Sequence, residues 1–206
     1  MAPGTYVTSS FNPFGNPATP GRMSYTVPDG WAVGEDRATD FVLNHPPAML
    51  VALLSQPRMA ADFTAVPTCG PPDDAPGVGR GLDDLVAAIV ARPGVVSTPP
   101  TAVAIGGHPG KLLDLRLAKS WTGSCTAPEG PVVGLAILNG GGPPPGPGVG
   151  LTPDHPARLI LLDLGSERTM AVVIFNFEPS QPDQFQQLVA GVMPIIESFE
   201  FHPPAP

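Results

Sequence analysis

The chain has 206 residues, of which 42% are hydrophobic and only 14% are charged, and its formal net charge is −8. This composition excludes a disordered chain, and the length suits a single domain, residues 1–206, with a substantial core. Only two lysines are present, Lys111 and Lys119, and basic residues form no cluster, so nucleic acids and anionic membrane surfaces are poor partners.

The N-terminal quarter predicts a series of strands. Two extended pieces flank a bend rich in Pro and Gly, and further apolar runs continue the series, so we expect strands near 5–11, 23–27, 31–35, 41–43 and 48–55. The stretch from Thr68 to Gly81 is a long predicted loop that carries Cys69.

Residues 82–94, LDDLVAAIVARPG, predict the first helix. The apolar residues recur at helical spacing, namely Leu82, Leu85, Val86, Ile89 and Val90, and the two aspartates favour the positive end of the helix dipole in the first turn. Pro93 and Gly94 end the helix.

The next segment predicts paired strands. Residues 101–105 and 111–117 read as a hairpin across the five-residue connection GGHPG, and GSER joins 158–164 to 169–175 in the same way. A further strand is expected at 132–138.

The tract 140–150 holds six glycines and four prolines and predicts a loop within the domain. It is either a solvated spacer between strands or an arm that presents an extended segment to a partner. As a spacer, it could be shortened at little cost in stability.

The last predicted helix lies near 181–196, and its apolar face is formed by Phe185, Leu188, Val189, Val192 and Ile196. Ser180 and Asp183 resemble a capping box, and Pro194 predicts a kink or an early end. Residues 198–201, SFEF, alternate like a short strand.

The segments 159–164 and 171–175 are apolar at nearly every position, so both faces of these strands should be covered. Their short connection makes the pairing antiparallel. We therefore predict an α+β fold with a mainly antiparallel central sheet, centred on 158–175 and flanked by helices, with the helix 181–196 on one face.

The order of these elements resembles the PsbP-like superfamily. The resemblance rests on the start YTVPDGW, the mid-chain helix, the hairpin TAVAIGGHPGKLLDLRL, the strands RLILLDLGSERTMAVVIF and the ending ESFEF. The chain is most similar to bacterial extracytoplasmic domains of this shape, found in lipoproteins and in exported parts of larger actinobacterial or chloroflexal proteins. Over most of residues 5–201, the resemblance implies an α/β/α sandwich with an accessory or binding role and no shared catalytic residues.

Cys69 and Cys125 are the two cysteines of the chain, 56 positions apart. Redox sites use Cys-x-x-Cys and zinc sites use closely spaced ligand pairs, and neither spacing occurs. Two cysteines in segments rich in Pro and Gly favour a structural disulfide, and the alternative is two unrelated buried thiols. A disulfide would favour an oxidising compartment.

The sequence holds none of the nucleophile-elbow or phosphate-loop motifs. A hydrolase would need acids that meet only in the fold, and Glu35, Asp36, Asp114 and Asp163 are candidates for such acids, with Asp154 and His155 as the sharpest local pair. A simpler interpretation than a catalytic role is that Asp114 and Asp163 are polar residues on the exposed side of edge strands.

Trp121, Asp154 and His155 are the candidates for a binding surface, although core packing for Trp121 and a solvated loop for the other two are the simpler interpretations. No metal site or cofactor is expected.

The favoured hypothesis is a non-catalytic extracytoplasmic accessory or binding domain with an unknown protein or small-molecule partner. The alternatives are a hydrolase and a structural protein that self-assembles. The N-terminus lacks the features of a signal peptide, so a secretion signal is expected to be absent from this chain, and no apolar run reaches the roughly 18 residues of a transmembrane helix. Oligomeric state is left open.

Overall fold

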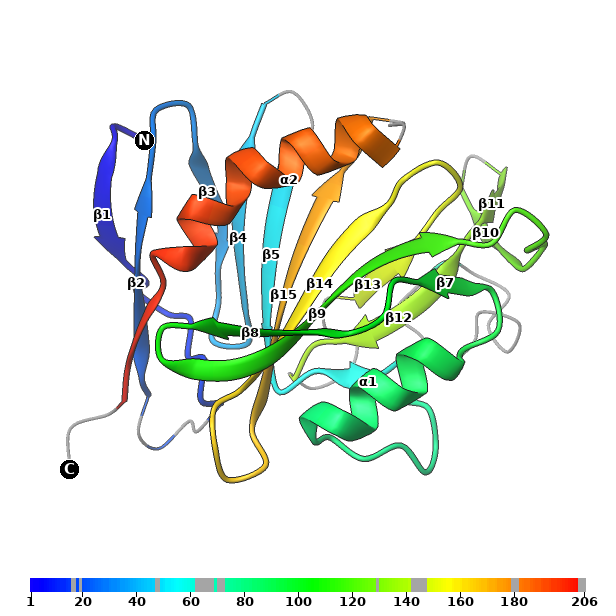
Figure 1. Cartoon of the computed structure of the whole chain (residues 1–206), viewed down its shortest axis with the longest axis horizontal. Helices are drawn as coiled ribbons and strands as arrows, with labels where there is room; N and C mark the ends of the chain where they lie inside the picture. Colours follow the sequence, from blue (N-terminus) through cyan, green and yellow to red (C-terminus); the bar gives the residue numbers. More distant parts are fainter. Residues whose placement is uncertain are drawn as a thin grey trace.

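A mainly antiparallel sheet forms the centre of the molecule (Figure 1). The computed structural model describes residues 1–15, 18, 20–46, 49–61, 69, 73–128, 130–141, 148–178 and 182–203. Within these residues, eight strands make up this sheet: β3 (Ala32–Asp36), β4 (Asp40–His45), β5 (Met49–Ser55), β15 (Thr169–Asn176), β14 (Ala157–Asp163), β9 (His108–Leu117) and β7 (Val95–Ser97) follow in this order, and β8 (Thr101–Ile105) pairs with β9.

Strands β14 and β15 lie in the middle of the sheet, as predicted. They pair with each other from Ala157↔Phe175 to Asp163↔Thr169, and their outer edges pair with β9 and β5. Alternate residues of both strands are buried on opposite faces, Ile160 and Val172 in one core and Leu161 and Val173 in the other. A strand covered on both faces gains hydrophobic burial from every residue, which explains the unbroken apolar runs.

One face is covered by the helix α2 (Pro182–Glu197) together with a small sheet of β1 (Gly4–Val7), β2 (Arg22–Val27) and β16 (Glu200–His202) (Figure 1). Phe185, Val189 and Ile196 of α2 are buried there, whereas Leu188, predicted on the same face, is exposed. The helix continues through Pro194 to Glu197, so the predicted early end at this proline is wrong. Pro194 is exposed, which leaves its ring on the solvent side of the helix.

The other face is covered by the helix α1 (Leu82–Ala91) and a second small sheet of β13 (Gly148–Leu151), β12 (Leu135–Asn139) and β6 (Arg58–Met59). Leu85, Val86 and Ile89 of α1 are buried there and Leu82 is partly buried, as their helical spacing predicts, whereas Val90 of the predicted apolar set is exposed. The hairpin of β10 (Ser124–Ala127) and β11 (Gly130–Val133) carries Cys125, which forms the predicted disulfide with Cys69.

The architecture corrects the predicted α/β/α sandwich, because each face of the central sheet is covered by one helix and one small sheet. Two other details differ. Gly134 separates β11 from β12, where one strand was predicted at 132–138. The hairpin of β8 and β9 turns over Gly106 and Gly107 alone, with φ of 56° and 80°. A five-residue connection was predicted between these two strands.

The predicted loop at 140–150 is also corrected at one end. Residues Gly148–Gly150 belong to β13 and pair with β12, so they are part of a ladder. A Cβ on Gly150 would lie 3.0 Å from the carbonyl oxygen of Leu135, so the small residue suits this close pairing. Residues 142–147 and Ser180, the predicted capping residue, lie outside the described residues.

Candidate functional site

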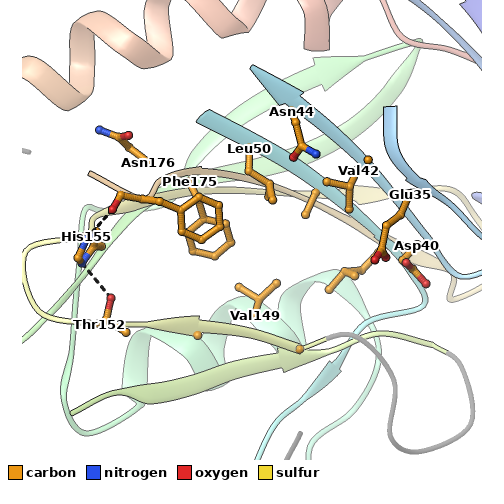
Figure 2. A pocket seen from close by; sticks show the side chains of 16 residues that line it. Glu35, Asp40, Val42, Asn44, Leu50, Val149, Thr152, His155, Phe175 and Asn176 are labelled. Carbon is orange, nitrogen blue, oxygen red and sulfur yellow. Dashed lines mark hydrogen bonds between the residues drawn. The ribbon is translucent and has the colours of Figure 1, made fainter. Parts of the chain in front are cut away.

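A cleft of about 590 Å³ lies between the central sheet and strand β13 (Figure 2). Strands β3, β4, β5 and β15 form one wall, and β13 with the turn after it forms the other. Its volume lies within the range of roughly 300–1,000 Å³ that small-molecule sites occupy.

The apolar middle of the cleft follows from strand alternation. Leu50, Ala52 and Leu54 are alternate residues of β5 and line the cleft, whereas Val51 and Leu53 are buried on the α2 side. Val149 faces them from β13, and Figure 2 shows it pointing into the space. Gly148 and Gly150 on either side of it add no side chain to this wall.

One end of the cleft is aromatic. Phe175 and Phe177 stack with ring centroids 6.5 Å apart and an angle of 17° between the planes. Phe177 is 64% exposed, the largest exposure among the large hydrophobic side chains in the described chain. An exposed aromatic ring at the edge of an apolar cleft is the kind of group that ligands cover when they bind.

Hydrogen bonds of the His155 ring hold this aromatic end of the cleft in place. Its Nδ1 lies 3.0 Å from the Thr152 hydroxyl and 2.7 Å from the Pro153 carbonyl oxygen, and its Nε2 lies 3.0 Å from the Phe177 carbonyl oxygen. These contacts tie the turn between β13 and β14 to the segment after β15. Because both ring nitrogens already have partners, we interpret His155 as a positioning residue of the cleft.

The opposite end of the cleft is acidic. Glu35 of β3 and Asp40 of β4 lie beside each other there (Figure 2). Asp40 is 1% exposed, and its Oδ1 accepts a hydrogen bond from the Thr39 hydroxyl. The guanidinium of Arg37 lies 3.1 Å from a Glu35 oxygen and 3.8 Å from Asp40 Oδ2.

The two carboxyls favour a shared proton. A hydrogen bond with Asp40 raises the pKa of Glu35 above its ordinary value, and burial and the Asp40 charge raise it further, while Arg37 acts in the opposite direction. When both carboxyls are ionised, no group in the described part of the chain donates a hydrogen bond to the buried Asp40 Oδ2. This oxygen is therefore an unused acceptor at the end of an apolar cleft.

The other candidate acids are engaged elsewhere. Asp114 accepts hydrogen bonds from Arg158 and Gln186, and Asp163 Oδ1 accepts one from the Gly165 amide. Asp114 lies on β9 and Asp163 on β14, and both strands are paired on both edges, so the interpretation of these two acids as residues of an edge strand is wrong.

Asp36 ties the N-terminal segment to β3. It accepts hydrogen bonds from the amides of Ser9, Ser10 and Phe11 and from the Ser9 hydroxyl. Burial raises the pKa of Asp36, but these hydrogen bonds outweigh it and lower the pKa below its usual value.

The candidates for a binding surface are not brought together. His155 lines the cleft, while Asp154 occupies the adjoining turn with φ of 62°. Trp121 is half-buried, and its Nε1 donates to the Gly134 carbonyl oxygen at 2.9 Å. Its ring packs against the core on the α1 side, where Gly94 leaves room for it.

Sequence reasoning named Glu35 and His155 but missed Asp40, Phe177 and the cleft itself. The density of acids in GEDRATD was the available signal for the carboxyl pair. Within the described ranges, no group of three or more His, Cys, Asp or Glu side chains is arranged to hold a metal ion, and neither α1 nor α2 is long and apolar enough to cross a bilayer.

Comparison with models of known families finds no match, and comparison with curated protein sequences finds none either. Similar solved structures include a protein from Bacteroides thetaiotaomicron, with 10% identity and a TM-score of 0.43. The match covers 97% of this chain and 48% of that protein, so this chain spans about half of its length.

Two further similar structures match over most of both chains. Cyanobacterial PsbP (CyanoP) from Synechocystis has 10% identity and a TM-score of 0.43, over 98% of this chain and 94% of that one. LpqN, involved in cell envelope biogenesis of Mycobacterium tuberculosis, has 12% identity and a TM-score of 0.40, over 97% and 92%. One of the similar structures is therefore a PsbP protein.

Proposed function

We propose that this protein is a non-catalytic extracytoplasmic binding domain that holds a small, largely apolar ligand in the cleft between β13 and the central sheet. The observation that carries the proposal is the cleft itself, an open space of about 590 Å³ with apolar walls and an exposed Phe177 at its edge. Ligand sites combine this kind of apolar lining with a few polar groups, which here are supplied by Asn44, Thr152 and the acidic end.

The position of the acids supports binding over hydrolysis. The hydrolase hypothesis needs two or more of Asp114, Asp154, His155 and Asp163 in one polar pocket. Among these four, His155 lines the cleft, while Asp114 and Asp163 are engaged in hydrogen bonds outside it. Glu35, a further candidate acid, also lines the cleft, but at the end opposite His155 (Figure 2). The ring nitrogens of His155 are occupied by main-chain and hydroxyl partners, which favours a role in holding the cleft open.

The disulfide supports the extracytoplasmic part of the proposal. Cys69 and Cys125 are bonded, and structural disulfides form and persist in oxidising compartments. The resemblance to exported PsbP-like domains points in the same direction.

A cleft-filling substitution tests the proposal. Ala52 lies on the cleft side of β5, so Ala52→Phe should occupy the space while the rest of the fold is kept. The matched control is Ala102→Phe, which places the same side chain on an exposed position of β8. Binding is measured as the fluorescence increase of Nile red, an uncharged apolar probe, titrated with each protein.

We expect saturable binding of the probe by the parent and by Ala102→Phe, and a loss of affinity of at least about tenfold for Ala52→Phe. Circular dichroism confirms that both variants are folded. Equal affinity of Ala52→Phe and the parent would contradict the cleft as the binding site.

A further inference from the structure

The acidic end of the cleft suggests the chemistry of the ligand, an inference that rests on the proposed function. Glu35 and Asp40 carry two carboxyls, and Arg37 supplies one guanidinium beside them. With both carboxyls ionised, one negative charge remains unbalanced at a position where Asp40 is 1% exposed. Burying an unbalanced charge is costly, so this end of the cleft favours either a shared proton or a cation.

Two observations show that the Asp40 charge is only partly compensated within the protein. Asp40 Oδ2 is buried and, among the described residues, receives no hydrogen bond when both carboxyls are ionised. Arg37 approaches it only to 3.8 Å, beyond hydrogen-bond distance, and most of the Arg37 side chain is in solvent.

We propose that the cleft takes a small molecule with an apolar body and a cationic amine, and that Glu35 accepts hydrogen bonds from the amine while the buried Asp40 beside it adds negative charge. The apolar body lies along Leu50, Ala52 and Val149 toward the Phe175–Phe177 stack, and the ammonium donates to the Glu35 carboxylate at the opposite end. An ammonium has three donors and needs few acceptors, whereas a hard metal cation such as Ca²⁺ requires six or more oxygen ligands.

A proton on Glu35 and a bound ammonium compete for the same carboxylate. The titratable groups that line the cleft are Glu35, Asp40 and, at the far end, His155, with Arg37 flanking the pair. Because the pKa of Glu35 is raised, protonated Glu35 competes with the ammonium at low pH. Affinity for an amine should therefore increase as pH rises through the Glu35 pKa, while affinity for a neutral ligand stays constant.

Three probes with the same aromatic body test the proposal: phenylbutylamine, phenylbutanol and phenylbutanoate. Isothermal titration calorimetry measures their dissociation constants with the parent, with Glu35→Gln and with the control Glu197→Gln on the exposed face of α2. Glu35 is partly exposed, so its substitution leaves the fold intact, and circular dichroism checks this.

We expect the parent and Glu197→Gln to bind phenylbutylamine at least about tenfold more tightly than phenylbutanol near neutral pH, with phenylbutanoate weakest. In Glu35→Gln the ratio between amine and alcohol should fall close to one, and in the parent it should shrink as pH falls through the raised Glu35 pKa.

Equal affinity of the parent for amine and alcohol, or a preference that survives Glu35→Gln or ignores pH, would overturn the amine proposal and leave the binding cleft standing. Failure of all three probes to bind would contradict the proposed function and the amine proposal together.

Discussion

Removal of Asp114 should destabilise the protein because this carboxylate joins three elements. Arg158 lies directly across from it in the β9–β14 ladder and donates two hydrogen bonds, at 2.7 and 2.8 Å. Gln186 of α2 donates to the same carboxylate at 2.8 Å and accepts from Arg158 at 3.0 Å. The side chains of Arg158 and Asp114 are only 14% and 19% exposed, so solvent screens their interaction weakly.

Asp114→Ala removes the three hydrogen bonds and leaves Arg158 without its counterion. Breaking a buried pair costs about 3–5 kcal/mol, and exposed pairs contribute about 0–1 kcal/mol, so we expect a loss of about 3 kcal/mol for this mostly buried one. For a chain of this size, that loss lowers the melting temperature by about 6–12 °C. A double-mutant cycle with Arg158→Ala should give a coupling energy of about 2 kcal/mol.

The contribution of Asp114 should also depend on pH. Burial raises the pKa of Asp114, but the hydrogen bonds from Arg158 and Gln186 outweigh it and lower the pKa. Since the folded pKa is lower than the unfolded one, the stabilisation is present above an unfolded pKa of about 3.9 and is lost as pH falls through the folded pKa.

Urea unfolding followed by circular dichroism, from about pH 7 down to about pH 3, measures the difference between the parent and Asp114→Ala. The control is Asp29→Ala, which alters an exposed carboxyl in the turn after β2 and should change the free energy of unfolding by less than about 0.5 kcal/mol. A coupling energy near zero, or a difference that persists unchanged at the lowest pH, would refute the reasoning.

Three further predictions concern the fold. Replacing both Cys69 and Cys125 with Ser should cost about 4 kcal/mol by the chain-entropy model, and thiol titration of the denatured, unreduced parent should find no free thiols, whereas two per chain would rule out the bond. Leu161→Asp buries an unpaired charge in a strand that is covered on both faces, and it should lower the free energy of unfolding by more than about 4 kcal/mol. The control Leu188→Asp, on the exposed part of α2, should lower it by less than about 0.5 kcal/mol. Similar melting temperatures for the two variants would contradict the central position of β14. Asp36→Ala should cost about 2 kcal/mol and speed hydrogen exchange at residues 9–11, and unchanged exchange there would show that Asp36 does not hold this segment.

The centre of the fold was predictable because its signals are local and strong. The runs at 159–164 and 171–175 are apolar on both faces, and the short connection between them leaves only antiparallel pairing. The spacing of Leu85, Val86 and Ile89 similarly predicted α1.

The two small sheets that cover the central sheet were harder to predict. Their short strands form where a neighbouring strand is available for pairing, even where the strand propensity of the residues is low. Gly148 and Gly150 favour a loop by propensity, yet their amides and carbonyls pair with β12 as well as any other residue would. Sequence reasoning therefore placed a loop where the structure has one wall of the cleft.

The candidate site was predictable only in part for the same reason. Glu35 and Asp40 are five positions apart on different strands, and only the β3–β4 pairing brings their carboxyls together. Phe177 was not singled out, because the end of an apolar run gives no sign of whether its last aromatic residue is buried or exposed.

The central claim is that a ligand occupies the cleft between β13 and the central sheet. Backbone amide chemical shifts, recorded by NMR as phenylbutanol is added to the parent, test it most directly because they locate the contact. We expect saturable shifts confined to the segments that line the cleft, which are β3, β4, β5, β13, residues 152–155 and residues 175–177, with those of α1 and β1 unchanged. Shifts centred on Trp121 or on the outer surface of α2, with β13 unaffected, would contradict it.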